Sequence, residues 1–243
     1  MIPITRNIIL ALMLIFVSNS NAQKFGFGCL GLSGFYVGIS EHHYKAQGIN
    51  NYVNTNAAGN LIKLDDEVNF NLSSGYRIGA NFFRAKWDQV FITAKGFFQF
   101  LKEEHALNPS QTLQHKFQLN MNQWGVGVDI GIPITSFFDW KIIEGGVTYY
   151  NSELVQQQFA DNSLTREIKF APEKGKTSYY VATGIIVHII PDYMSLEGTA
   201  AYNVMNINEF IHNLPDVGGS KIKEPFSKYG FSGTFQLNIS FPF

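Results

Sequence analysis

Two segments of the chain alternate apolar and polar residues, and this pattern constrains the fold more than any other feature. In residues 68–82 the apolar side chains share one parity, and in residues 229–243 the same alternation runs to the last phenylalanine. Successive side chains of a β-strand point to opposite faces, whereas a helix repeats every 3.6 residues. Both segments are therefore predicted to be strands with one apolar and one polar face, and neither fits an amphipathic helix.

Six further segments alternate more weakly and bring the predicted number of strands to eight. Within residues 115–133 the apolar parity changes, so we predict a β-bulge near Asn122 and Gln123, with a break in the strand as the alternative. Ten strands are a second alternative, because residues 50–64 and 160–171 either extend their neighbours or form a separate hairpin. The six segments span 31–42, 89–101, 115–133, 140–152, 176–190 and 194–206.

The connections between these strands alternate in length. The short ones fall near 83–88, 134–139 and 191–193. Tight periplasmic turns and longer extracellular loops are typical of transmembrane barrels, and a soluble sandwich has no reason to alternate in this way. The long connections are rich in Asn, Gln, Lys and Glu and fall near 43–67, 102–114, 153–175 and 207–226.

The first residues have the features of a secretory signal. Arg6 gives a positive start, residues 8–17 form an apolar run, and Ser20 and Ala22 supply small residues for cleavage. Ten apolar residues are too few for a membrane-spanning helix. We therefore predict a signal peptide over 1–22 and one β-barrel domain over 23–243.

Composition excludes some partners. The chain has 22 Phe and 11 Tyr, only 15% of its residues are charged, and its net charge is −1. No basic footprint for nucleic acid is present, so we predict no nucleic-acid partner. Cys29 is the single cysteine, which rules out an intrachain disulfide and favours a packed thiol.

The signal segment, the Gly- and aromatic-rich residues 31–39 and the terminal residues 238–243 resemble small bacterial outer-membrane β-barrel proteins, the outer-membrane-protein-A-like or porin-like barrels. The resemblance implies an all-β, transmembrane, antiparallel up-and-down barrel in the outer membrane, with both termini periplasmic. It also implies two partners, outer-membrane lipid and the barrel-assembly machinery, which would read Phe241 and Phe243. Pro242 departs from the usual alternation of such a signal.

Charged residues on the polar parity predict a cluster inside the barrel. They lie at similar distances from the predicted short turns, so they share one height in the periplasmic half of the lumen. Charges in a narrow interior must pair with one another. An eight-stranded barrel is just wide enough for side chains to fill, which favours a structural role. The predicted cluster consists of Arg77, Lys95, Asp129, Glu144 and Glu197, joined by His188.

Glycines and aromatics add two expectations. Gly125, Gly127 and Gly131 share the parity of Asp129 and are predicted to make room for larger inward side chains. Tyrosines and tryptophans near the strand ends are predicted to form interfacial girdles, with some of them pointing inward.

Motifs for catalysis or metal binding are absent from the sequence. It has no phosphate-binding Gly-rich loop, no His-Glu-x-x-His and no Gly-x-Ser-x-Gly. A catalytic interpretation would have to use His105 or His115 with Ser110, or His42 with Asp65, and nothing in the spacing fixes these pairs. We therefore predict no catalytic residue, no metal site and no cofactor.

The sequence favours a non-enzymatic envelope protein whose barrel displays long extracellular loops for adhesion, partner binding or envelope integrity. Its predicted partner is an extracellular ligand or another envelope protein, contacted mainly by residues 43–67 and 153–175. The alternatives are a lipid-modifying or proteolytic enzyme, a barrel for small solutes, and a docking subunit of a secretion or motility assembly.

Overall fold

The computed structural model describes residues 24–26, 33–57, 67–87, 89–107, 113–212 and 221–241. The predicted signal peptide, Cys29 and Phe243 lie outside these residues. Within them, no helix has the length and apolar character needed to cross a membrane. The elements are β1 (Lys24–Gly26), β2 (Gly34–His43), α2 (Gln47–Tyr52), the π-helical turn η2 (Val53–Ala57), β3 (Leu72–Trp87), β4 (Val90–Leu107), β5 (Leu113–Pro133), β6 (Phe138–Ala160), β7 (Ser163–Ala171), β8 (Lys176–Ile190), β9 (Met194–Val204), β10 (Glu209–His212), β11 (Ile222–Lys223) and β12 (Tyr229–Ser240).

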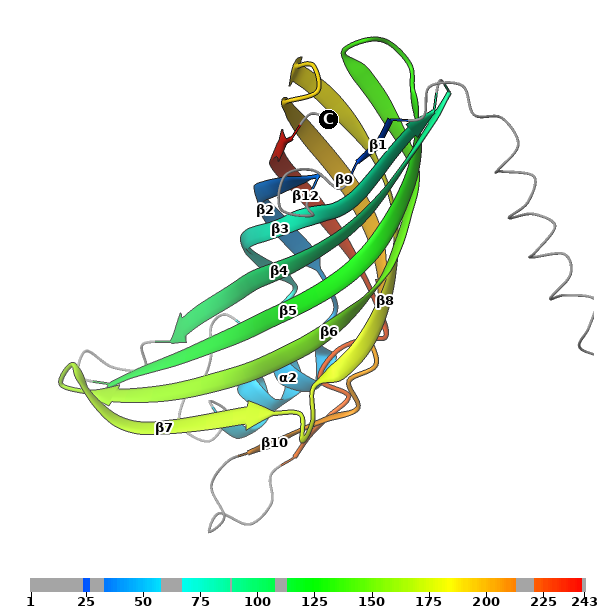
Figure 1. The fold of residues 1–243 in the computed structure, drawn as a ribbon. Coiled ribbons are helices and arrows are strands. Elements are labelled where there is room, and N and C mark those ends of the chain that lie inside the picture. The colour runs from blue at the N-terminus through cyan, green and yellow to red at the C-terminus, as the bar shows by residue number, and fades with distance from the viewer. Residues whose placement is uncertain are drawn as a thin grey trace, which may run out of the picture.

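Eight antiparallel strands close into a barrel, which confirms the predicted fold class (Figure 1). The ring runs β2–β3–β4–β5–β6–β8–β9–β12, and β12 returns to β2 from Phe231 opposite His43 to Ser240 opposite Gly34. Closure gives every strand of the ring two neighbours, so it leaves no row of unpaired backbone groups in lipid. Outside the ring, β7 pairs with β6, β10 with β7 and β11 with β10.

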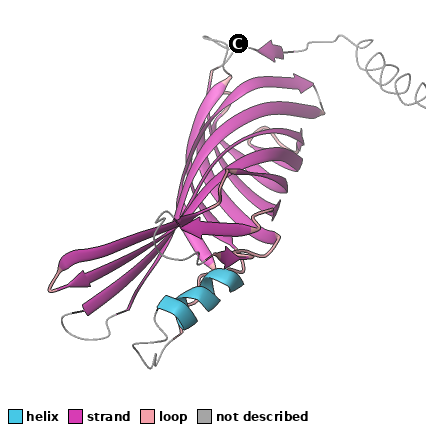
Figure 2. Cartoon of the chain, turned by 90° about the horizontal axis from the view of Figure 1, so that it is seen from below, coloured by secondary structure: helices cyan, strands magenta, loops and turns pink. Residues whose placement is uncertain are grey.

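The two ends of the barrel differ. At one end, here called the turn end, β3, β6 and β9 meet their neighbours through the connections 88–89, 134–137 and 191–193. The first residue of β2 and the last residue of β12 also lie there, paired with each other. The opposite end, here called the cap end, carries α2, η2, β7, β10 and β11. Figures 1 and 2 show the barrel strands β4, β5 and β6 continuing with β7 past the other strands at this end.

Two predicted long loops are mostly strand. β4 continues to Leu107 and β5 begins at Leu113, so only 108–112 separate them. β6 continues to Ala160 and turns through Asp161 and Asn162 into β7. Both turn residues have positive φ, 49° and 62°, which is the backbone of a two-residue hairpin and which Asp and Asn tolerate well. Residues 160–171 therefore form a hairpin with the end of β6, as the alternative proposed. Residues 50–57 form helical turns, so the strand that the alternative placed there is wrong, and residues 58–64 lie outside the described residues.

The outer wall of the barrel is apolar. On β5, Trp124, Val126, Val128 and Ile130 point outward, and between 40% and 49% of each side chain is exposed. The other strands of the ring continue this band with outward Phe, Ile, Val, Leu and Tyr. A soluble barrel would bury such residues, whereas lipid accommodates them. The chain is therefore a transmembrane barrel of the outer-membrane type.

The polarity of β5 inverts along its length without a bulge. Phe117, Leu119 and Met121 point inward and are fully buried, and from Trp124 onward the apolar residues point outward. The pairing of β5 with β4 and β6 is continuous through Asn122 and Gln123, so the bulge predicted there is wrong. The apolar side changes because the strand leaves the lipid band and enters a region where its outer face is polar and its inner face packs in a core.

The structure places its register shifts elsewhere. On β3 the pairing with β4 skips Phe82, and on β6 the pairing with both neighbours skips Ile142. Both residues point outward and are more than 40% exposed. A bulge of this kind lets two consecutive side chains share one face, which is why Ile142 and Ile143 both lie on the apolar wall.

The change of the apolar side along β5 predicts where the lipid layer ends on this strand. We expect Val126→Lys to destabilise the barrel by about 2–4 kcal/mol, because it places a charge on the lipid face. The matched change Gln118→Lys, on the same side of the same strand but beyond the inversion, should cost almost nothing. Urea unfolding of both variants in lipid vesicles measures the difference. Equal losses would place Gln118 inside the bilayer and refute the boundary.

Candidate functional site

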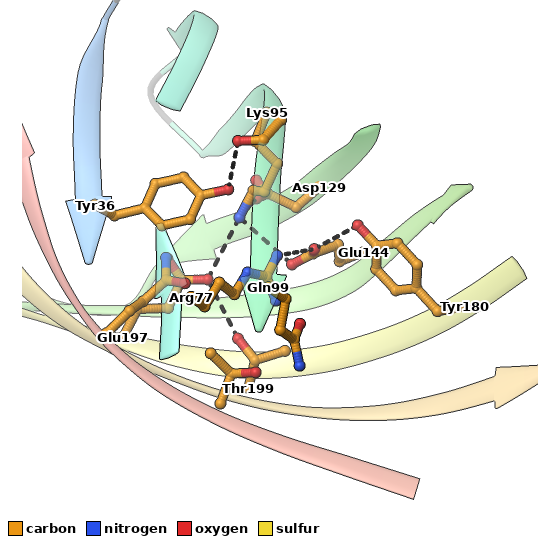
Figure 3. A network of polar contacts seen from close by, with 12 residues as sticks. Tyr36, Arg77, Lys95, Gln99, Asp129, Glu144, Tyr180, Glu197 and Thr199 are labelled. Carbon is orange, nitrogen blue, oxygen red and sulfur yellow. Dashed lines mark hydrogen bonds and ion pairs between the residues drawn. The ribbon is translucent and has the colours of Figure 1, made fainter. Parts of the chain in front are cut away.

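The barrel interior holds a buried ionic cluster, shown in Figure 3. Lys95 lies at its centre: its Nζ is 2.6 Å from Asp129 Oδ2 and 3.4 Å from both Glu144 and Glu197. Arg77 approaches Glu144 at 3.9 Å. The structure therefore brings together five of the six residues that the sequence proposed for a lumen cluster, and all five are at most 7% exposed.

Lys141 belongs to the same cluster, although the sequence pattern did not indicate it. Its Nζ contacts both Glu144 and Glu197 and also donates to Thr199 Oγ1 at 2.8 Å. Lys141 and Glu144 have opposite parities in sequence, and the bulge at Ile142 turns both inward. The two consecutive isoleucines were the available signal for that bulge. With Lys141 included, the cluster balances three cations against three carboxylates.

Polar side chains from the remaining strands complete the cluster. The Tyr180 hydroxyl donates to Glu144 Oε1 at 2.8 Å, and the side-chain amides of Gln236 and Asn238 each donate to Glu197 Oε2 at 3.1 Å. The Arg77 guanidinium lies 3.8 Å from the centre of the Phe97 ring, a cation–π contact. With Tyr36 of β2 close to Arg77, all eight strands of the ring reach this layer. The cluster thus cross-links the whole circumference of the barrel.

His188 lies in a separate group closer to the turn end. Its Nε2 is 2.8 Å from Asp139 Oδ2, and Arg84 approaches the same oxygen at 3.7 Å. The structure therefore places His188 beside Asp139 and Arg84 rather than beside the central cluster. Asp139 is only 1% exposed, so its carboxylate needs polar partners inside the barrel, and Arg84 and His188 supply them.

Glycines on β5 make room for inward aromatic rings, as the sequence predicted. A Cβ built at Gly127 would lie 2.2 Å from the Tyr180 hydroxyl, and one at Gly131 would lie 2.3 Å from the Phe91 ring. The cluster layer is therefore packed solid around its charges, in keeping with a barrel of this size.

Above the cluster, the lumen ends in an apolar core at the cap end. Buried aromatic and aliphatic side chains from the extended strands, from the helical turns and from β10 and β11 meet there. The main members are Tyr44, Ile49, Val53, Val68, Phe70, Leu101, Phe117, Leu119, Met121, Leu154, Phe170, Phe210, Ile222 and Phe226. This core, hereafter the cap core, closes the barrel mouth.

Two asparagines tie the helical turns to the chain segment before β3. Asn50 Oδ1 accepts the backbone N–H of Phe70 at 2.8 Å, and Asn54 Oδ1 accepts that of Val68 at 3.0 Å. Residues four apart lie on one face of a helix, and residues two apart lie on one face of an extended segment. The asparagines therefore replace a partner strand and hold Phe70 and Val68 in the cap core.

Tyr44 and Glu103 form a second polar tie at the cap. The Tyr44 hydroxyl contacts Glu103 and lies 2.9 Å from Ser73 Oγ, while Glu103 accepts the backbone N–H groups of Asn71 and Leu72 at 3.0–3.2 Å. Burial, together with the charge of Glu103, raises the pKa of Tyr44. Tyr44 therefore remains a hydrogen-bond donor, and Glu103 binds the backbone N–H groups of the two residues where β3 begins.

Comparison with known proteins finds structural likeness only. No protein-family model and no curated protein sequence matches the chain. The solved structures that resemble it include Ail, the attachment invasion locus protein of Yersinia pestis, with 12% identity over 88% of this chain and all of that one, TM-score 0.39. Neisserial surface protein A gives 13% identity over 87% and 99% of the two chains, TM-score 0.38. The outer membrane protease OmpT of Escherichia coli gives 9% identity over 86% and 94%, TM-score 0.40.

Among the described residues, no hydrogen bond joins His42, His105 or His115 to a serine or threonine hydroxyl, although His42 lies opposite Ser73 and Ser232 on its two neighbouring strands. His105 pairs with Glu103 at 3.0 Å and packs on Phe70, and His42 is buried between the rings of Tyr44 and Tyr150. His115 is buried and points inward from β5. Ser110 and Asp65 lie outside the described residues. Across the described ranges, no three His, Cys, Asp or Glu residues group as metal ligands.

The described part of the predicted assembly signal is Phe241. Its ring packs edge-on against Phe35 of β2, with centroids 5.7 Å apart. Recognition of Phe241 and Phe243 by the assembly machinery stays a prediction.

Proposed function

We propose that this protein is a non-enzymatic outer-membrane protein whose closed barrel carries a rigid interaction surface on the outside of the cell. The observation that supports the proposal most directly is the inversion of polarity on β5, beyond which the sheet has an apolar inner face and a polar outer one. Such a sheet resembles that of a soluble domain, with one face packed in a core and the other in water. A barrel that only spans the membrane does not need this extension. The cap end then faces the medium and the turn end faces the periplasm.

The outer face of this sheet, here called the display face, presents ordered polar groups. Glu104 lies 2.6 Å from both Lys102 and Lys116, and hydrogen bonds from these lysines lower the pKa of Glu104. Asn120 donates to Glu153 at 3.0 Å, and Gln157 donates to Glu167 at 2.7 Å. Groups held in fixed positions lose little conformational entropy on binding, which suits a contact surface.

The structure revises which of the predicted segments, 43–67 and 153–175, can contact a partner. Residues 44–57 contribute Ile49 and Val53 to the cap core, so much of this segment supports the surface rather than forming it. The β6–β7 hairpin projects beyond the core instead, and Leu164 beside its turn is 51% exposed. We therefore assign the contact surface to the display face and the hairpin tip.

Labelling in intact cells tests the orientation. With Cys29 replaced by serine, Lys116→Cys should react with a membrane-impermeant maleimide, and Phe137→Cys at the turn end should react only after the cells are lysed. The reverse pattern would place the display face in the periplasm and refute the proposal.

An adhesion assay on cells tests whether the hairpin tip forms the contact surface. Deletion of residues 158–167 removes the hairpin tip and spares Leu154 and Phe170 of the cap core. We expect adhesion to abiotic surfaces and aggregation between cells to fall to the level of a strain that lacks the whole protein. The heat-modifiable band should persist as the control for folding. If the strain that lacks the protein loses adhesion but the tip deletion does not, the hairpin tip is not the contact surface.

A further inference from the structure

A groove on the outer wall combines aromatic rings with cations at the level where the wall changes from apolar to polar. The groove measures about 760 Å³ and lies where β9 and β12 meet the end of β2. His43, Phe231 and Tyr202 are consecutive partners across these three strands, and all three point outward. Tyr229 stacks on Tyr202 at a centroid distance of 5.7 Å.

Lys45 lines the upper side of this groove, and Lys228 lies beside it in the chain, between the lining residues Ser227 and Tyr229. The backbone N–H of Ser227 donates to the carbonyl of Lys45 at 2.7 Å, so Lys45 and Lys228 lie on neighbouring segments. Both side chains are exposed. Within the part of the chain that the structure describes, neither lysine has an ion-pair partner, whereas Lys102 and Lys116 share Glu104. On the side of β2 the neighbouring acid is Glu41, which points outward two residues below His43. On the other side, Glu209 and Glu224 line a separate hollow that Lys228 also borders.

An apolar slot continues the groove toward the turn end. It measures about 620 Å³. Gly233 and Ala200 follow Phe231 and Tyr202 in the same outward rows, so the slot begins where the aromatic groove ends. A Cβ at Gly233 would meet no atom within 4 Å, which shows how open the slot is. The slot has a floor of Gly198, Ala200 and Gly233 and walls of Ile39, Ile185 and Phe235.

We propose that the groove and slot bind one phosphorylated lipid of the surrounding leaflet. Its phosphate would contact Lys45 and Lys228, its glycerol or sugar part would lie against Tyr202 and Tyr229, and one acyl chain would fill the slot. Aromatic rings favour the headgroup level of a bilayer, and basic side chains there attract anionic lipids. The unpaired charges favour this occupant over a second protein, because a neutral apolar partner would leave both lysines unmatched. The inference goes beyond the proposed function and does not depend on it.

Native mass spectrometry of the intact barrel in detergent tests the proposal with defined lipids. Dipalmitoyl phosphatidic acid should bind more tightly than dipalmitoyl phosphatidylcholine. Each of Lys45→Ala and Lys228→Ala should weaken phosphatidic acid binding on the order of fivefold, from the attraction expected per basic residue. Lys102→Ala with Lys116→Ala is the matched control and should leave binding unchanged. Glu41→Gln should strengthen binding.

The slot has its own test. Gly233→Leu fills it and should weaken binding of dipalmitoyl phosphatidic acid while sparing the dibutyryl form. Heat-modifiable mobility shows that each variant folds. Equal binding of the two headgroups, or an unchanged headgroup preference after both lysines are removed, would overturn the proposal. Full displacement of the lipid by inorganic phosphate would also overturn it, because the site would then hold a phosphate ion and no lipid.

Discussion

Glu144→Ala is expected to lower the free energy of unfolding of the barrel by about 3–5 kcal/mol. Glu144 is 1% exposed and has Lys95, Lys141, Arg77 and Tyr180 around it. Its removal leaves three buried cations against two carboxylates, so one positive charge loses its compensation in a medium of low dielectric constant. The loss should appear as a lower midpoint of urea unfolding in lipid vesicles.

The control for this prediction is Glu104→Ala on the display face. Glu104 also contacts two lysines, each at 2.6 Å, but its side chain is 34% exposed. Water and salt screen such a pair, so we expect a loss of less than about 1 kcal/mol. The double change Glu144→Ala with Lys141→Met restores the balance of charge and should recover part of the stability. A Glu144→Ala loss no larger than that of Glu104→Ala would show that the cluster does not hold the barrel together.

Alternation in the sequence was sufficient to predict the barrel because lipid enforces it. Every outward side chain in the bilayer must be apolar, and in a filled lumen the inward ones must be small or polar, so the period of two survives on all eight strands. The predicted strand at residues 176–190 matches β8 in full. The same constraint brought Arg77, Lys95, Asp129, Glu144 and Glu197 together, because residues at equal distance from one rim share a height.

The alternation led to a wrong prediction at the point where the strands leave the lipid. Phe117, Leu119 and Met121 changed parity relative to Trp124, and we attributed the change to a bulge. The true cause is that the outer face of β5 passes from lipid to water. The apolar side chains therefore switch from the outer to the inner face, while the backbone pairing stays regular. Period alone cannot separate these two causes. The polar outward residues Gln118 and Asn120 were the distinguishing signal, because a bulge inside lipid would have kept the outer face apolar.

The cap core was not predicted, because many of its residues come from segments that the sequence shows as loops. Ile49, Val53 and Phe226 lie in the long connections 43–67 and 207–226, and each of these two connections contributes, among its described residues, four spaced apolar side chains to the core. Their burial depends on contacts far apart in sequence, such as Asn50 with Phe70. Local pattern carries little information about such contacts, whereas it carries most of the information about a strand.

Phe210→Ala is expected to release the cap while the barrel stays folded. Phe210 is fully buried, and its ring packs edge-on against Phe226 at 5.7 Å, which in turn packs against Tyr44 at 5.3 Å. Truncating a buried phenylalanine costs about 3–5 kcal/mol. Because β10 lies outside the closed ring, this loss falls on the cap and leaves strand pairing in the barrel intact.

Hydrogen exchange measured by mass spectrometry distinguishes the stability of the cap from that of the barrel. In Phe210→Ala, amides of α2 and β10 should exchange roughly 100-fold faster or more, since about 3 kcal/mol of local stability corresponds to that factor. Amides near Asp129 in the ionic layer should keep their protection. The matched variant Phe98→Ala removes an outward ring from the lipid face and should leave exchange in the cap unchanged. Faster exchange throughout the barrel in Phe210→Ala would mean that the cap and the membrane-spanning ring unfold as one unit, and the display face would then depend on the ring itself for its rigidity.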